Sequence, residues 1–349
     1  MHILIIGAGL YGCHVATMLK KMNISFKILD KNNVFFSGSS SKNQNRLHQG
    51  FHYCRSYYTR KECIQGYNKF ITNYDFAVEH IPNNYYFIEK NSIIDYNTYI
   101  HIYSHENLEF TEHNIAKLPF KYNHEKFEGN AILTNECYIN FMKLKSHFEE
   151  TFALDLEPNF DATKLIITDD VIEYKNETFT HVIDCTYFQL DLKNVTIPKP
   201  DVFYEICVVF LYKQNIPSKL FAMTIMDGPF MSLYPYNLEE NIYTLTDVYR
   251  TPIMKTSDIN VINNTNISDE CIQVIRAEVE DNISQYIPSF LHDFTYNGYY
   301  LAIKTKPIAQ SDDRSLIHIK SENNKIHRFS GGKLTGIFEL EEILKTLKD

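Results

Sequence analysis

Three glycines in a Gly-x-Gly-x-x-Gly spacing follow a short apolar run at the start of the chain, and this feature limits the possible folds most. The apolar run, residues 2–6, has the length and continuity of a strand buried on both faces of a parallel sheet. Residues 10–22 carry apolar side chains at helical spacing. A strand, a glycine-rich turn and a helix open a βαβ unit, so we predict a Rossmann-like unit that binds a dinucleotide.

Each glycine has its own role in such a turn. Gly7 permits the tight turn, Gly9 lets the backbone approach a pyrophosphate, and Gly12 lets the helix pack closely on the strand. A second apolar run ends at Asp30, whose carboxylate can accept hydrogen bonds from a ribose diol. A glycine triplet alone also occurs in plain turns, but here the strand, helix and acid are all present. Cofactor contacts are expected from Gly7, Gly9, Leu10, Tyr11, Gly12, Asp30 and Lys31.

Charge and composition exclude several classes of protein. The 34 basic and 43 acidic side chains leave a net charge of −9 without a basic footprint, which argues against general nucleic-acid binding. The seven cysteines are scattered and never spaced Cys-x-x-Cys, so we expect reduced thiols and no metal site. No apolar run approaches the roughly 18 residues of a membrane span, and the N-terminus lacks signal-peptide features. We therefore expect a soluble, cytoplasmic protein.

The remaining segments indicate two interleaved domains of an α/β protein. Helices are expected over residues 57–80 and 136–152, and short aromatic-rich strands over residues 83–135. Alternating strands dominate after residue 200, interrupted by a helix that Ser268 would cap. We predict a dinucleotide-binding domain of residues 1–82, 136–197 and 298–349, with a mostly antiparallel sheet of residues 83–135 and 198–297 inserted as the substrate-binding domain.

Two later segments favour FAD over a nicotinamide cofactor. The sequence THVIDCT, residues 180–186, resembles the second nucleotide motif of flavoproteins with two dinucleotide folds, in which a strand ends in a threonine-containing turn beside the FAD. The sequence SGGKLTG, residues 330–336, leads into a helix, and the N-terminus of a helix favours negative charge. A reduced flavin develops such a negative charge. Taken alone, the first is an ordinary buried strand and the second a glycine-rich turn.

Over nearly its whole length, the chain resembles the D-amino-acid-oxidase-like (glutathione-reductase-2 type) FAD-dependent oxidoreductases. The segments that carry this resemblance come in the order GAGLYG, Asp30, SSSKNQNRLHQGFHY (residues 39–53), HVIDCT and GGKLTG. The resemblance implies bound FAD, an inserted antiparallel sheet that carries the substrate, and a serine- and asparagine-rich segment beside the flavin. It adds these cofactor-binding residues: Ser39, Ser40, Ser41, Asn45, Arg46, Leu47, His48, Thr186, Gly331, Gly332, Lys333, Leu334 and Thr335. Two departures are Tyr187, where glycine is common, and Asp30 in place of glutamate.

Five side chains are candidates for catalysis. His48 and His52 can exchange a proton near neutral pH, although either could serve packing alone. Lys333 would lie near the flavin N1 edge, with a solvated lysine as the alternative. The strands of the inserted sheet supply Tyr234 and Arg250, which suit a polar, anionic substrate, or else belong to a solvated sheet face.

The leading hypothesis is an FAD-dependent oxidoreductase. It would transfer a hydride to flavin N5 from a CH–OH or CH–NH carbon of a small polar substrate, such as a hydroxy acid, an amino acid or amine, or a sugar derivative. One alternative is a flavin enzyme similar to the UDP-galactopyranose mutases, which acts on a nucleotide sugar. Another is a catalytically idle FAD-binding module that recognises a partner through its strand-rich insertion. The electron acceptor stays open.

Overall fold

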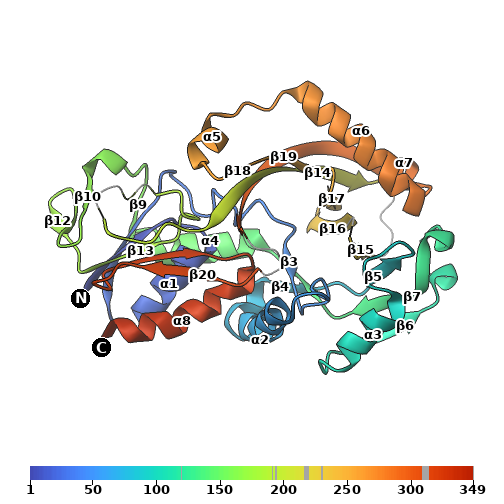
Figure 1. Cartoon of the computed structure of the whole chain (residues 1–349), viewed down its shortest axis with the longest axis horizontal. Coiled ribbons are helices and arrows are strands. Elements are labelled where there is room, and N and C mark those ends of the chain that lie inside the picture. The colour runs from blue at the N-terminus through green and yellow to red at the C-terminus, as the bar shows by residue number, and fades with distance from the viewer. Residues whose placement is uncertain are drawn as a thin grey trace.

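The computed structural model describes residues 1–118, 120–190, 192, 195–215, 220–228, 231–308 and 314–348 (Figure 1). Two large sheets organise this part of the chain. The first has six strands in the order β20 (Ile317–Lys320), β21 (Ile326–Ser330), β13 (His181–Asp184), β1 (His2–Ile6), β2 (Ser25–Leu29) and β9 (Leu156–Glu157). Its neighbours are parallel except for β20 and β21.

Both faces of the six-stranded sheet are covered, as the continuous apolar run of β1 requires. Ile3 and Ile5 pack into a core shared with four helices, which are α1 (Leu10–Lys21), α2 (Tyr57–Tyr74), α4 (Phe141–Phe152) and α8 (Ile337–Lys345). Leu4 and Ile6 point the other way, because successive strand residues alternate between faces. They pack against a small antiparallel sheet of β10 (Leu165–Ile167), β11 (Ile172–Tyr174) and β12 (Glu177–Thr178). The predicted βαβ opening is confirmed.

The second large sheet has nine strands and is antiparallel except where β15 pairs with β5. Its path is β18 (Pro252–Thr256), β14 (Val202–Gln214), β17 (Ile242–Asp247), β16 (Met231–Asn237), β15 (Ala222–Met226), β5 (Asn84–Glu89), β7 (Phe127–Thr134) and β6 (Phe110–His113), and β19 (Phe294–Pro307) pairs with β14. Helix α6 (Asp269–Tyr286) runs along its outer face with α5 (Ile259–Asn264) and α7 (Phe290–Asp293) near its ends (Figure 1). As predicted, Ser268 caps α6, since its hydroxyl accepts the Cys271 N–H at 3.2 Å.

A third, small sheet joins the two parts. Strand β8 (Cys137–Ile139) pairs with β3 (Arg46–Leu47) on one side and β4 (Val78–His80) on the other. Two helix predictions were wrong at this point. The helix expected over residues 57–80 ends at Tyr74, because the following residues enter β4, and the helix expected from residue 136 begins at Phe141. Asn140 caps that helix by accepting the Lys143 N–H at 3.1 Å, which leaves the preceding residues free to form β8.

Two further predictions need correction. Residues 96–104 form helix α3 (Tyr96–Ser104) where only strands were expected, and the Asp95 side chain caps it by accepting the Thr98 N–H at 2.9 Å. The predicted domain boundary at residue 298 lies inside β19, which pairs with β14 from Phe294 to Pro307. Residues 298–307 therefore belong to the nine-stranded sheet. Phe230, at the predicted start of β16, lies outside the described residues. In the described ranges, no helix is both long and apolar enough to cross a membrane.

Candidate active site

The turn between β1 and α1 is so tightly packed that only glycine fits at two of its positions. Gly7 has a φ of +107°, and a Cβ there would lie 2.9 Å from the Cys185 carbonyl oxygen. A Cβ on Gly12 would lie 1.9 Å from the Gly7 carbonyl oxygen. The turn thus brings the backbone of the helix start, strand β1 and the residues after β13 into contact, which is the cradle expected for a dinucleotide.

Two side chains complete the N-terminus of α1. The Ala8 N–H donates to Asp30 Oδ2 at 2.7 Å, and the Leu10 N–H donates to Ser40 Oγ at 2.9 Å. Asp30 and Ser40 therefore lie at the helix end where an anion would be favoured. Lys31 is exposed, with its amine 3.5 Å from Gln189 Oε1, and lies at the surface beside this turn.

The segment of residues 39–53 is tied to the nine-stranded sheet. Ser39 Oγ donates to the Ile303 carbonyl of β19 at 3.2 Å. Gln44 Nε2 donates to Thr246 Oγ1 of β17 at 3.1 Å, and Asn45 Nδ2 donates to the Tyr236 carbonyl of β16 at 3.1 Å. The Ser41 hydroxyl donates to the Gly38 carbonyl at 3.2 Å, and the Ser41 carbonyl accepts from Tyr236 Oη of β16 at 3.4 Å. The segment thus forms a fixed wall between the two sheets.

The C-terminal glycine segment meets the N-terminal turn through two tyrosines. Tyr11 Oη donates to the Lys333 carbonyl at 2.6 Å, and Tyr187 Oη donates to the Gly331 carbonyl at 2.8 Å. A Cβ on Gly331 would lie 1.6 Å from Tyr11 Oη, so a larger residue has no space there. Tyr187 has a φ of +63°, a conformation that glycine adopts more easily. Thr186 turns the chain just before it by donating its hydroxyl to Asp184 Oδ1 at 2.5 Å.

A small cavity lies where the two predicted flavin segments come together. Its lining consists of Arg46, Leu47, His48, Lys333, Leu334 and Thr335. Arg46 Nε, His48 Nδ1 and Thr335 Oγ1 are buried and have no hydrogen-bond partner within the described part of the chain. Buried polar atoms are normally hydrogen-bonded, so these three atoms suit a polar ligand lying against them. The cavity itself has a volume of about 10 Å³, which is room for about one water. A separate surface hollow, lined by residues 195–198 and 320–322, contains none of the predicted site residues.

Burial changes the protonation of the cavity groups. Burial, and after it the nearby Arg46 guanidinium, lowers the pKa of Lys333 to about 7. The Lys333 amine lies 3.7 Å from the centroid of the Tyr53 ring, a favourable place for its charged form. Burial also lowers the pKa of His48 well below its usual value, again with contributions from Lys333 and Arg46. At neutral pH His48 is therefore neutral, and Lys333 can either hold or release a proton.

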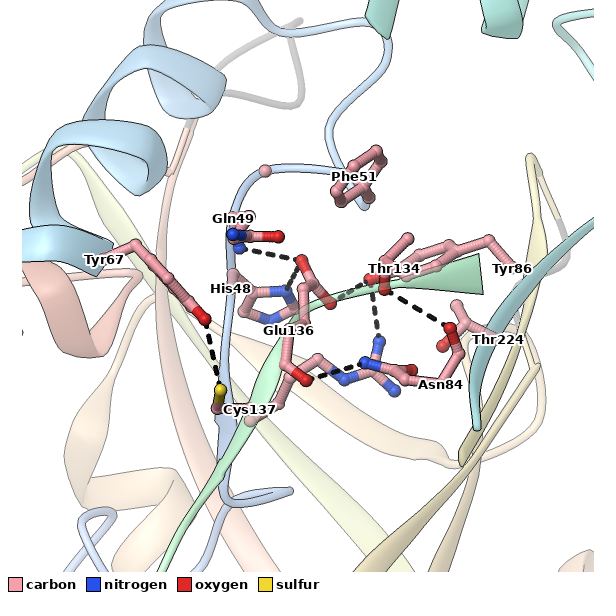
Figure 2. A network of polar contacts seen from close by, with 12 residues as sticks. His48, Gln49, Phe51, Tyr67, Asn84, Tyr86, Thr134, Glu136, Cys137 and Thr224 are labelled. Atoms are coloured by element: carbon pink, nitrogen blue, oxygen red, sulfur yellow. Dashed lines mark hydrogen bonds and ion pairs between the residues drawn. The ribbon is translucent and has the colours of Figure 1, made fainter. Parts of the chain in front are cut away.

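Arg46 reaches into the nine-stranded sheet. Its Nη1 donates to Tyr86 Oη at 3.1 Å and its Nη2 donates to Ser232 Oγ at 2.7 Å. The guanidinium stacks on the Tyr234 ring at 4.0 Å from the centroid. Tyr86 in turn donates to Glu136 Oε2 at 2.6 Å. Figure 2 shows Glu136 with His48 and Gln49 on one side and Tyr86 on the other.

Three predicted catalytic residues lie outside the cavity lining. His52 packs behind His48, with ring centroids 5.4 Å apart. Tyr234 is fully buried and donates its hydroxyl to the Cys137 carbonyl at 3.0 Å, so it supports Arg46 and does not face a substrate. Arg250 pairs with Asp247 at 2.8 Å.

The place of Arg250 follows from the alternation of side chains along β17. Asp247, its partner, also accepts a hydrogen bond at 2.9 Å from Asn282 of α6. Arg250 therefore lies on the helix-covered face of the sheet, whereas Thr246 faces the segment of residues 39–53. The structure thus places Arg250 away from the cavity lined by Arg46, His48 and Lys333.

Sequence reasoning missed Tyr53, Tyr86, Glu136 and Ser232. Glu136 was expected inside a helix. Tyr53 ends the segment of residues 39–53, although it was not among the candidate residues. Tyr86 and Ser232 reach the site only through the pairing of distant strands, so no motif singles them out. Arg314 donates its backbone N–H to Thr59 Oγ1 at 3.0 Å. Its neighbours Asp312 and Asp313 lie outside the described residues.

Comparisons with known proteins agree with this geometry. No protein-family model matches the chain. It is 31% identical over 351 residues to the FAD-dependent monooxygenase FPY4 of Fusarium mangiferae, covering 99% of this chain and 90% of that protein. Among solved structures, the FAD-bound L-alpha-glycerophosphate oxidase of Mycoplasma pneumoniae superposes with a TM-score of 0.72 at 13% identity, covering 98% and 92% of the two chains. The amino acid oxidase NikD superposes with a TM-score of 0.74 at 10% identity, covering 96% and 91%.

Proposed function

We propose that this protein oxidises a CH–OH or CH–NH carbon of a small polar substrate. The chain belongs to the D-amino-acid-oxidase-like FAD-dependent oxidoreductases, in the group of the fungal FAD-dependent monooxygenase FPY4. Its fold, its cofactor FAD and its standing as an enzyme follow from that membership. The proposal adds the type of reaction and the residues. The observation that carries it is the cavity in which Arg46, His48 and Lys333 meet.

The residues present fit FAD along the whole path from α1 to the cavity. The close-packed turn at Gly7 and Gly12 and the N–H groups of α1 would hold the pyrophosphate. Asp30 would hold the ribose, and Ser40 would lie beside the phosphates. When bound, FAD supplies a hydride acceptor at N5. Residues 46–48 and 333–335 would lie against the ring, which needs more space than the cavity of about 10 Å³ between them.

The chain's own groups suit the proton that such an oxidation must release. Oxidation of a CH–OH or CH–NH carbon removes a hydride from carbon and a proton from the heteroatom. His48 is neutral at pH 7 and can accept that proton. The neutral fraction of Lys333 can do the same, because its pKa lies at about 7. The charged fraction of Lys333, with the permanently charged Arg46, favours a substrate that carries an anionic group.

The test is anaerobic reduction of the bound flavin. Holoenzyme is mixed with panels of hydroxy acids, amino acids and amines, and sugar derivatives, and flavin absorbance near 450 nm is followed. Bleaching by a panel member, abolished in His48→Gln or Lys333→Met, supports the proposal. A substrate that is turned over only after prior reduction of the flavin, without bleaching it, would contradict the proposal and favour the mutase-like alternative.

A second candidate reaction comes from the relative named a monooxygenase, which is 31% identical to this chain. A monooxygenase requires an external reductant and incorporates oxygen into its product. Bleaching by NADPH or NADH in the absence of substrate, followed by oxygen-dependent product formation with ¹⁸O label, would favour it. The cytoplasmic location and the absence of nucleic-acid partners stay predictions.

A further inference from the structure

The carboxylate of Glu136 lies behind the cavity, beside His48 and linked to Arg46 through the Tyr86 hydroxyl. Glu136 is 0% exposed and directly precedes β8, the central strand of the small sheet that joins the two parts. We propose that Glu136 is a positioning residue that holds His48 and Arg46 in place and sets the charge of the cavity. This inference rests on the proposed function, since it takes the cavity as the flavin site.

One oxygen of Glu136 fixes the chain beside His48. Oε1 accepts the Gln49 N–H at 2.8 Å and lies 3.6 Å from His48 Nδ1 (Figure 2). At 3.6 Å the interaction with the ring is electrostatic, because a hydrogen bond requires a shorter distance. The carboxylate favours a proton on Nδ1, and that tautomer leaves Nε2 as the acceptor of a substrate proton.

The other oxygen acts on Arg46 through a tyrosine. Oε2 accepts the Tyr86 hydroxyl at 2.6 Å, and that hydroxyl accepts from Arg46 Nη1 at 3.1 Å. Arg46 is nearly buried, so its charge needs a counter-charge nearby. In the described ranges, the hydrogen bonds of Arg46 reach the carboxylate of Glu136 through a single bridging hydroxyl, that of Tyr86. The same carboxylate therefore orients two side chains that line the cavity.

The charge of Glu136 should also change the pKa values of the titrating groups of the cavity. The charged and titratable groups around His48 are Arg46, His52, Tyr53, Glu136 and Lys333. Burial raises the pKa of Glu136, and Arg46 opposes that change. Among these groups Glu136 is the only carboxyl, and it contributes a negative charge when it is ionised. Removing the charge of Glu136 should lower the pKa of His48 and of Lys333, because the positive charge of Arg46 then opposes their protonation without a negative charge to offset it.

The experiment uses holoenzyme and the absorbance of bound FAD as a function of pH between 5 and 9. Glu136→Gln keeps the size of the side chain and its hydrogen-bonding capacity but removes the charge. We expect FAD to remain bound and the titration midpoint to fall by about one pH unit. His48→Gln and Lys333→Met identify the titrating group, because one of them should abolish the transition. Glu205→Gln is the matched control, since Glu205 is 7% exposed and pairs with Lys306 at 2.5 Å within the nine-stranded sheet.

Each outcome has a defined meaning. An unchanged midpoint in Glu136→Gln, with a transition that His48→Gln or Lys333→Met removes, overturns the inference and leaves the proposed function standing. A transition that neither of those two variants alters overturns the assignment of the cavity as the flavin site, and both proposals with it. If Glu136→Gln does not retain FAD, Glu136→Asp replaces it. A titration midpoint in Glu136→Asp equal to that of wild type supports the proposal that the negative charge at this position sets the midpoint. A midpoint lowered by about one pH unit contradicts that proposal.

Discussion

Replacing Lys333 by methionine should stabilise the FAD-free protein, although it removes a group of the proposed site. Burial and Arg46 lower the pKa of this amine from 10.5 to about 7. That lowering corresponds to about 5 kcal/mol at about 1.36 kcal/mol per pH unit. Solvent reaches part of the side chain and screens part of this cost, so we expect a gain of about 2–4 kcal/mol at pH 6. Methionine keeps the apolar stem beside Tyr53 and removes the charge.

The sign of the pH dependence follows from proton binding in the two states. Unfolded chains hold the Lys333 proton up to about pH 10.5, whereas the folded protein releases it above about pH 7. Between these values the unfolded state binds more protons, so wild-type stability rises with pH. The cost of the charge is complete below pH 7 and disappears toward pH 10.5. The advantage of Lys333→Met should therefore shrink by about half or more between pH 6 and pH 9.

Urea unfolding followed by far-UV circular dichroism measures this, because the chain has no tryptophan for a fluorescence assay. Wild type, Lys333→Met and the control Lys42→Met are compared at pH 6 and pH 9. Lys42 is exposed in the same segment as His48, so its substitution should change stability little at either pH. A variant no more stable than wild type at pH 6, or an equal gain at both pH values, would refute the reasoning.

Three further predictions concern the glycine turn, Arg46 and Arg250. Gly12→Ala should reduce the FAD content of purified protein and lower the free energy of unfolding by about 1–3 kcal/mol, because its Cβ would lie 1.9 Å from a backbone carbonyl oxygen. Gly38→Ala is the control and should change neither quantity, because the space around Gly38 is open. Arg46→Met should cost about 1–3 kcal/mol in urea unfolding by leaving buried hydroxyls without their donor, and an unchanged midpoint would count against the network. Arg250→Ala should leave flavin bleaching by substrate unchanged, and slower bleaching would return this residue to the substrate site.

Local sequence patterns predicted the cofactor half of the protein well. The apolar run of β1, the glycines of the turn and Asp30 act within about 30 residues of one another, so their spacing determines a single local structure. Residues 46–48 and 333–335 were also assigned to one site, although the chain separates them widely. That assignment required the resemblance to a family, because spacing alone does not relate two distant turns.

The polar side chains around the cavity depended on tertiary structure. Glu136 belongs to the short strand-forming stretch before α4, and Tyr86 and Ser232 come from β5 and β16 of the other sheet. Which face of a strand a residue occupies depends on register, and register depends on partners far along the chain. For the same reason the sequence could not separate Asp247, which binds Arg250 on the helix-covered face, from its neighbour Thr246 on the opposite face. The sequence by itself indicated the βαβ opening, its glycine turn and FAD as the cofactor, and the pairing of distant strands decided which charged side chains meet near the predicted site.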